Sequence, residues 1–416
     1  MPKRRTVAPA NIQTQAAAMK SRRLFSPGNR FLILYLSFLS AFAPISTDMY
    51  LPALPSIART FATTNELASA TISAFILLFA VSMLFWGPVS DRYGRKPVLL
   101  AGAALYIVSS MALCLTHSIE VFLFWRGIQA LGSGAASAMS LAIVKDVLRG
   151  GSMEKVVAVM QATVIIAPLT APVLGGWLLL VVDWRGIFLC LAVCGALALL
   201  GAICLKETNP RRNARSLSAT FKRMGHAVAN RNFLFPLLIF SAMSMPFMSY
   251  LAVSAFIFQE TFHVSAQHYS LFFALNAFCS LLGPFLHIGV FRQWNRNRVL
   301  TGHLLVICLA GIGVLLWGAN GPWAFALLFA PISFCGSAMR APATVLMMES
   351  IQGDNGIVAS LINCAGLLFG AVSMLLASLP FWPGAIMAVG CISAAISGLC
   401  LAAWLIVARR RQALAA

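Results

Sequence analysis

The turn Gly87-Pro88-Val89-Ser90-Asp91-Arg92-Tyr93-Gly94-Arg95-Lys96-Pro97 joins two long apolar stretches, residues 69–90 and 98–116. Each stretch is about 20 residues long, which is the length of helix that crosses a bilayer. Gly94 suits a tight turn because glycine accepts positive φ, and Pro97 suits the first turn of a helix. The segment therefore predicts two transmembrane helices joined by a short, charged turn.

The rest of the chain repeats this arrangement. Of its 416 residues, 60% are hydrophobic and only 10% are charged, whereas soluble domains carry about a quarter charged residues. The expected fold class is an all-α membrane protein with twelve transmembrane helices. The predicted spans are residues 31–54, 69–90, 98–116, 119–144, 156–180, 184–205, 232–259, 268–291, 299–318, 322–346, 357–379 and 382–408.

The net charge of +19 reflects membrane topology rather than nucleic-acid binding. Lysines and arginines precede the first span and recur in every second loop, with seven between Lys206 and Arg231. The other set of loops holds only Arg59 and Arg185. By the positive-inside rule both termini are cytoplasmic, and the basic loops attract anionic lipid.

The longest hydrophilic interruption divides the spans into two halves of six. Gly87-Pro88 in the first half is echoed by Gly283-Pro284 in the second, and each pair is followed by a basic turn. Parallel six-span repeats favour a transporter whose site lies between the halves. The predicted parts are a basic cytoplasmic tail (1–30), an N-terminal bundle (31–205), a cytoplasmic linker (206–231), a C-terminal bundle (232–408) and a second tail (409–416). The composition of residues 1–30 would also suit a transit peptide.

The turn between spans 2 and 3 resembles the GxxxDRxGRK signature of the major facilitator superfamily, with every key position filled. The resemblance implies that this turn is a conformational latch. Its residues would be Gly87, Asp91, Arg92, Gly94 and Arg95. Asp91 would face the start of span 11 near Gly356, where the dipole of a helix N-terminus favours negative charge.

Two charged residues lie well inside the N-terminal spans. Asp48 follows an uncharged run, and a carboxylate at bilayer depth needs a neutral form, water or a cation. Arg126, followed three residues later by Gln129, resembles the second signature of the superfamily, and arginine keeps its charge in proteins. We expect Arg126 to pair with Asp48 and to take part in proton coupling. An arginine that only positions its helix is the alternative.

Span 5 contains Ala167-Pro168-Leu169-Thr170-Ala171-Pro172-Val173-Leu174-Gly175-Gly176. This run resembles the third signature, gxxxGPxxGG, which is associated with antiporters, although Ala171 replaces the usual glycine. Proline interrupts helix hydrogen bonds and glycine permits close packing. A hinge formed by Pro168, Pro172, Gly175 and Gly176 is therefore expected, with a generic kinked helix as the alternative.

The run Asp48-Met49-Tyr50-Leu51-Pro52-Ala53-Leu54-Pro55 resembles the first-span signature of the bicyclomycin-resistance (Bcr/CflA) branch of drug–proton antiporters. Residues 183–188, 206–208 and 272–276 add to this resemblance, which extends from about residue 30 to 408. Some members carry a second acid two turns before Asp48. Ser40 stands there in this chain, so the expectation is a mechanism with one carboxylate.

The resemblance implies a multi-pass protein of the bacterial inner membrane that exports small amphipathic compounds in exchange for protons. It would be a transporter rather than an enzyme, monomeric, and without a cofactor, metal or nucleic-acid partner. An exporter of one endogenous metabolite, such as an amino acid or a siderophore, is the alternative. Candidates for the substrate cavity are Tyr50, Gln129, Phe247, Tyr250, Phe256, Asn276, Arg340 and Asn363. Arg340 lies late in span 10, where it would either extend to the membrane interface or bind anionic substrates.

Overall fold

The computed structural model describes residues 30–209, 217–291, 293–350 and 355–415, and every regular element within them is a helix. Eleven helical stretches are long and apolar enough to cross a membrane, and a bent pair of helices supplies the twelfth crossing. The predicted fold class is confirmed. The predicted N-terminal tail lies outside the described residues, apart from Arg30.

The bent pair is the first span, which consists of four short helices. They are α2 (Arg30–Ser40), α3 (Phe42–Asp48), η1 (Leu51–Ala53) and α4 (Leu54–Thr60). The two parts of the span meet at 47°. Prolines at positions 52 and 55 begin the last two helices, because a proline without an N–H is tolerated in the first turn. Asp48 is consequently the last residue of α3, next to a break, and the span continues beyond the predicted limit of residue 54.

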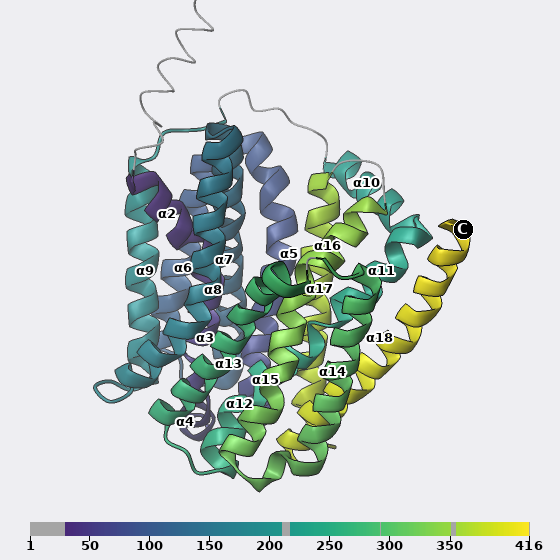
Figure 1. Ribbon diagram of the computed structural model, residues 1–416. Helices are drawn as coiled ribbons and strands as arrows, with labels where there is room; N and C mark the ends of the chain where they lie inside the picture. The colour runs from purple at the N-terminus through teal and green to yellow at the C-terminus, as the bar shows by residue number, and fades with distance from the viewer. Residues whose placement is uncertain (1–29, 210–216, 292, 351–354, 416) are drawn as a thin grey trace, which may run out of the picture.

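The N-terminal half is completed by five long helices. They are α5 (Asn65–Tyr93), α6 (Arg95–Cys114), α7 (Ile119–Val147), α8 (Gly150–Leu178) and α9 (Trp184–Cys204). α10 (Leu217–Ala229) lies within the predicted linker and leads to the second half. Figure 1 shows the purple-to-blue helices of the first half beside the green-to-yellow helices of the second.

The C-terminal half contains more interrupted helices than the first. They are α11 (Arg231–Ala242), α12 (Met245–Phe256), η2 (Ile257–Thr261), α13 (Ala266–Leu286), η3 (His287–Phe291), α14 (Arg296–Trp317), η4 (Gly318–Asn320), α15 (Pro322–Ala338), α16 (Arg340–Glu349), α17 (Asn355–Ala377) and α18 (Ala385–Ala415). α18 therefore continues as a helix through the predicted second tail.

The turns between helices lie at two ends of the molecule. We call the end with the turn between α5 and α6 the basic end, and the end with the turn between α4 and α5 the opposite end. Four helices that start at the opposite end are capped by a side-chain oxygen, which accepts a backbone N–H that the helix leaves free. The capping residues are Thr64, Ser118, Asp183 and Ser265.

Four hydrogen bonds described between the halves all lie toward the opposite end. They run from Asn65 Nδ2 to Glu260 Oε2 (2.6 Å), from Ser69 Oγ to the Ala252 carbonyl (2.9 Å), from Gln259 Nε2 to the Pro52 carbonyl (3.0 Å) and from Gln267 Nε2 to the Gly176 carbonyl (3.0 Å). The two halves are thus joined directly at this end of the molecule.

Candidate functional site

Asp48 is a buried carboxylate without a cationic partner among the described residues. Thr47 Oγ1 donates to Asp48 Oδ1 at 2.8 Å, and the same hydroxyl lies 3.0 Å from the Ala43 carbonyl. One hydroxyl proton cannot serve both acceptors at once. A protonated Asp48 would donate to Thr47 and leave the threonine proton for Ala43, so these contacts suit a neutral carboxyl group.

Arg126 of α7 is fully buried in an aromatic cage. Its guanidinium carbon lies 4.3 Å from the ring centre of Tyr50, 4.5 Å from that of Phe75 and 5.8 Å from that of Phe188. Aromatic faces attract cations, by roughly 0.5–2 kcal/mol each when the cation is desolvated. The cage therefore supplies part of the stabilisation that a carboxylate would otherwise give.

The guanidinium also anchors a chain of hydrogen bonds. Arg126 Nη1 donates to Gln129 Oε1 at 2.5 Å and to the Ser46 carbonyl at 3.3 Å. Gln129 Nε2 donates in turn to Ser110 Oγ at 2.8 Å. Arg126 Nε and Nη2 have no hydrogen-bond partner in the described part of the chain. Two nitrogens of the charged guanidinium are thus buried without a hydrogen bond.

The predicted ion pair between Asp48 and Arg126 is not made in this structure. Arg126 donates to the main chain at Ser46, two residues before Asp48, and the carboxylate takes its hydrogen bond from Thr47. The physical reason is the aromatic cage, which holds the guanidinium on the side of α7 where Tyr50 and Phe75 lie. Arg126 thereby fixes the backbone that precedes Asp48 rather than the carboxylate itself.

Gly175 and Gly176 allow α8 to pack closely against two other segments of the chain. A methyl group on Gly175 would lie 1.8 Å from the Met49 carbonyl oxygen, next to Asp48 in the chain. A methyl group on Gly176 would lie 2.3 Å from Ser270 Oγ of α13, in the other half. Glycine is required at position 175, where the obstacle is backbone, whereas a methyl group at position 176 would require the Ser270 side chain to move. Pro172 and Pro168 lie about one and two turns earlier within the same helix.

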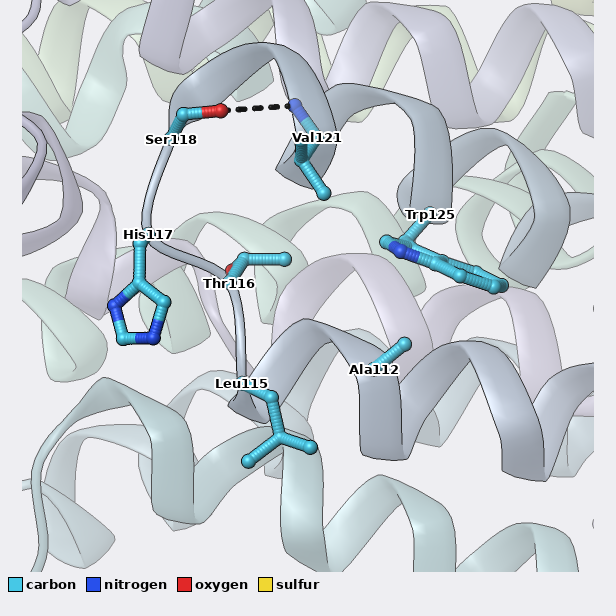
Figure 2. Close-up of a pocket in the computed structure, with 7 residues that line it drawn as sticks. All are labelled: Ala112, Leu115, Thr116, His117, Ser118, Val121 and Trp125. Atoms are coloured by element: carbon cyan, nitrogen blue, oxygen red, sulfur yellow. Dashed lines mark hydrogen bonds between the residues drawn. The ribbon is translucent and has the colours of Figure 1, made fainter.

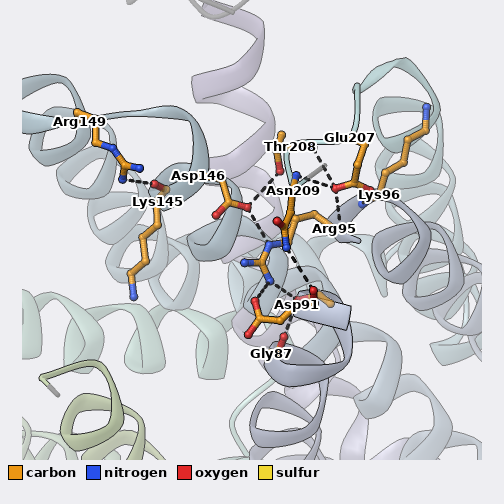
Figure 3. A network of polar contacts seen from close by, with 11 residues as sticks. Gly87, Asp91, Arg95, Lys96, Lys145, Asp146, Arg149, Glu207, Thr208 and Asn209 are labelled. Carbon is orange, nitrogen blue, oxygen red and sulfur yellow. Dashed lines mark hydrogen bonds and ion pairs between the residues drawn. The ribbon is translucent and has the colours of Figure 1, made fainter. Parts of the chain in front are cut away.

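A network of charged groups surrounds the predicted latch at the basic end (Figure 3). Arg95 pairs with Asp91 at 2.7 Å and with Asp146 of α7 at 2.8 Å. Asp146 also accepts from Thr208 Oγ1 at 3.3 Å. The guanidinium therefore joins the ends of α5 and α7 to the segment that follows α9.

Glu207 caps the start of α6 in this network. Its carboxylate accepts backbone N–H groups from Arg95 (2.9 Å), Lys96 (3.1 Å), Thr208 (3.0 Å) and Asn209 (3.0 Å). Gly94, with φ of +105°, makes room for it, because a methyl group there would lie 2.4 Å from Glu207 Oε2. Two backbone donors at the N-terminus of α6 and two from the residues after Glu207 form a strong site for one negative charge.

The latch residues have different surroundings in this structure. Asp91 pairs with Arg95, Arg92 lies over its neighbour Tyr93, and the carbonyl of Gly87 accepts from Ser90 Oγ. The contact predicted for Asp91 with the start of span 11 is not among the described interactions. Residues 351–354, which precede α17, lie outside the described residues.

We expect Glu207→Gln to lower the stability of the purified protein by roughly 1–3 kcal/mol, because one oxygen and the charge are lost from a cap that serves four N–H groups. The measurement is the thermal unfolding midpoint in detergent. Glu120→Gln is the matched control, since Glu120 is an exposed first-turn glutamate of α7. Equal midpoints for the two variants would contradict the capping role.

Five of the eight predicted cavity residues are buried in side-chain packing. Tyr50 and Gln129 belong to the Arg126 cluster, and Tyr250 stacks on Phe329 with ring centres 4.3 Å apart. Phe256 is buried, and so is Asn276, whose amide has no hydrogen-bond partner among the described residues. Phe247 is half-buried, whereas Asn363 and Arg340 are exposed.

A shallow depression lies at the opposite end, between the end of α6 and the start of α7 (Figure 2). It is lined by Ala112, Leu115, Thr116, His117, Ser118, Val121 and Trp125. None of the predicted site residues contributes to it. In the described part of the chain, no cluster of three or more His, Cys, Asp or Glu residues could hold a metal ion.

Residues 36–371 match the family model of the Major Facilitator Superfamily. The chain belongs to this superfamily. Membership makes it a multi-pass membrane transporter of small molecules rather than an enzyme, as the sequence predicted.

Two bacterial proteins illustrate its place in the Major Facilitator Superfamily. The uncharacterized MFS-type transporter YdgK of Bacillus subtilis is 29% identical over 349 residues, which cover 82% of this chain and 87% of YdgK. The multidrug resistance protein MdtL of Escherichia coli O157:H7 is 31% identical over 288 residues, which cover 68% of this chain and 72% of MdtL.

Solved structures of transporters have the same fold at low sequence identity. The peptide transporter POT in complex with sulfate gives a TM-score of 0.72 at 14% identity, over 91% of this chain and 93% of POT. The D-xylose-proton symporter gives 0.68 at 16% identity, over 89% of this chain and 96% of the symporter. These similarities concern the fold alone.

Sequence reasoning missed several contacts that surround the site of this major facilitator protein. Asp146 was not predicted as a site residue, although an acidic residue within a basic loop indicates an ion pair with a neighbouring cation. Gln259 and Gln267 gave no signal, because an isolated glutamine near the end of a span resembles any polar interface residue. The contact of Gly175 with Met49 joins residues far apart in the chain, and spacing alone cannot reveal it.

Proposed function

We propose that this transporter exports small amphipathic compounds from the bacterial cytoplasm in exchange for protons, as a member of the Bcr/CflA type. The observation that supports this most is Asp48, a buried carboxylate beside a helix break, with no ion pair to a cation in the described residues and with contacts that suit its neutral form. The antiporter-like run of α8 packs against the same segment through Gly175. The multidrug resistance of MdtL supports the drug class.

The orientation follows from the charge distribution. With the basic end in the cytoplasm, the four hydrogen bonds between the halves would lie on the outer side, as in a carrier whose outer end is closed. In the proposed cycle Asp48 takes a proton when the carrier faces outward, and its neutral form is buried as the carrier turns inward. Substrate entering from the cytoplasm then favours release of the proton. One charge crossing 100 mV supplies about 2.3 kcal/mol.

Arg126 has a positioning role in this mechanism. It remains in its cage and holds the Ser46 carbonyl, so that the break after Asp48 stays in place. Proton release would therefore depend on the surroundings of Asp48, such as water or substrate, rather than on a direct ion pair.

Transport by purified protein tests the proposed function. The protein is reconstituted in liposomes with an acidic lumen, candidate compounds are added outside, and lumenal pH is followed. Amphipathic drugs are expected to release lumenal protons only when the protein is present. Failure of every compound to move protons, despite measurable binding, would overturn the proton coupling.

Export of an anionic metabolite is a second candidate, supported by Arg340. Arg340 is the only charged residue in the six predicted C-terminal spans. Its side chain is exposed, and it has no hydrogen bond or ion pair among the described residues. A permanently charged and unpaired group of this kind would favour substrates that carry a carboxylate or a phosphate.

We expect Arg340→Gln to raise the half-saturating concentration of a carboxylate compound at least tenfold, about the effect of losing one charge-assisted hydrogen bond. Transport of the matching uncharged amide should stay the same. Both are measured by proton release from the same liposomes. An equal effect on the acid and on its amide would contradict anion recognition and leave the drug exporter as the better account.

A further inference from the structure

Two glutamines of the C-terminal half donate hydrogen bonds to main-chain carbonyls of the N-terminal half. Gln259 Nε2 donates to the carbonyl of Pro52, four residues after Asp48, at 3.0 Å. Gln267 Nε2 donates to the carbonyl of Gly176, next to the glycine that abuts Met49, at 3.0 Å. Both contacts join the halves at the end that is closed in this structure.

The segment that contains Asp48 takes part in the contacts that join the two halves at this end. The Met49 carbonyl packs against Gly175, and Gly176 packs against Ser270. The side-chain amides of Gln259 and Gln267 add two hydrogen bonds at the same end of the molecule. A movement of the Asp48 backbone therefore changes the positions of both acceptor carbonyls. Since the acceptors are main-chain atoms, no side-chain rotation in the N-terminal half can release them. On that side of the contact only a shift of the backbone breaks the bonds.

The element that carries Gln259 supports this role. Gln259 lies in η2 (Ile257–Thr261), a π-helical turn that continues α12 and places Gln259 half-buried against the first span. Wider π turns within helices occur frequently at functional sites. The next residue, Glu260, accepts from Asn65 of α5, so the same turn contacts the N-terminal half at two points.

We propose that Gln259 and Gln267 are positioning residues that allow the outer end to open only after Asp48 has released its proton. The inference rests on the proposed proton antiport. A carrier whose outer end opens at the wrong moment exposes Asp48 to both sides in turn without substrate, and protons then leak. Each bond is a neutral hydrogen bond with a net value of about 1 kcal/mol, equivalent to about fivefold in the ratio of open to closed carriers.

The test measures the collapse of an imposed pH gradient in proteoliposomes without any substrate. We expect Gln259→Leu and Gln267→Leu each to accelerate the collapse about fivefold over the wild type, by the arithmetic above. Gln259→Asn, which keeps the amide but shortens its reach, should accelerate it in the same direction. Gln161→Leu is the control, because Gln161 is an exposed glutamine of α8 that takes part in none of the four bonds.

Combination with Asp48→Asn identifies the path of the leak. Gradient collapse in the double variants should return to the wild-type rate, because the proton would have to travel on Asp48. An accelerated leak that survives Asp48→Asn would overturn the coupling role and indicate a non-specific opening. If wild-type protein shows substrate-evoked proton release and the glutamine variants leak no faster, this inference alone is wrong. If the wild type releases no protons with any substrate, the proposed function fails first.

Discussion

Asp48→Asn is expected to abolish substrate-evoked proton release, reducing it to the level of liposomes without protein. The amide keeps the size of the carboxyl group and can still bond to Thr47, but it cannot exchange a proton. Since no other acid lies well inside the predicted N-terminal spans, no second group is placed to replace it. The readout is lumenal pH after addition of a transported compound.

Two controls separate this effect from misfolding. The amount of Asp48→Asn protein in the membrane and its elution from a sizing column should match the wild type, since a neutral group at this site is easier to bury than a charged one. Glu154→Gln, at an exposed glutamate of α8, should leave proton release unchanged. Undiminished release by Asp48→Asn would remove Asp48 from the mechanism.

Gly175→Ala should reduce transport at least tenfold while the protein still inserts and folds. The new methyl group would meet the Met49 carbonyl at 1.8 Å, and a backbone atom cannot rotate away. Overpacking of this kind costs roughly 1–3 kcal/mol and shifts the neighbouring segment. Because that segment contains Asp48, we expect fewer protons released per substrate as well as a lower rate.

Gly336→Ala is the matched control for this substitution. Gly336 lies in α15, and a methyl group there meets nothing within 4 Å. Alanine is the better helix former by about 1 kcal/mol, so the control should be equally or more stable. Equal transport rates and thermal midpoints for the two alanine variants would show that the contact with Met49 is unimportant.

The fold could be predicted because its signals are local. Apolar stretches of the right length, the turn around Gly94 and the alternation of basic loops each depend on neighbouring residues. The first span shows the limit of prediction from local signals. Its sequence predicted one helix, whereas the structure divides the span into four short helices. Proline positions indicated that a break was possible, but packing decides where the chain bends.

The site could be predicted in part. Asp48 and Arg126 were found because charge in an apolar span is conspicuous. Their expected pairing rested on a motif and on the lack of another acid well inside these spans, and it omitted competition from aromatic rings. Phe75 lies in α5, Phe188 in α9 and Tyr50 in the break between α3 and η1, and their spacing in the sequence does not predict a cage. Long-range contacts between apolar residues leave almost no signal in a single sequence.

The acceptors of Gln259 and Gln267 have an evolutionary consequence. A main-chain carbonyl persists whatever side chain occupies its position, so substitutions at the acceptor positions leave the hydrogen-bonding atom in place. Selection for these two bonds would then fall on the donor side alone, at positions 259 and 267. At the two acceptor positions of the N-terminal half, these bonds constrain the path of the backbone and not the type of side chain.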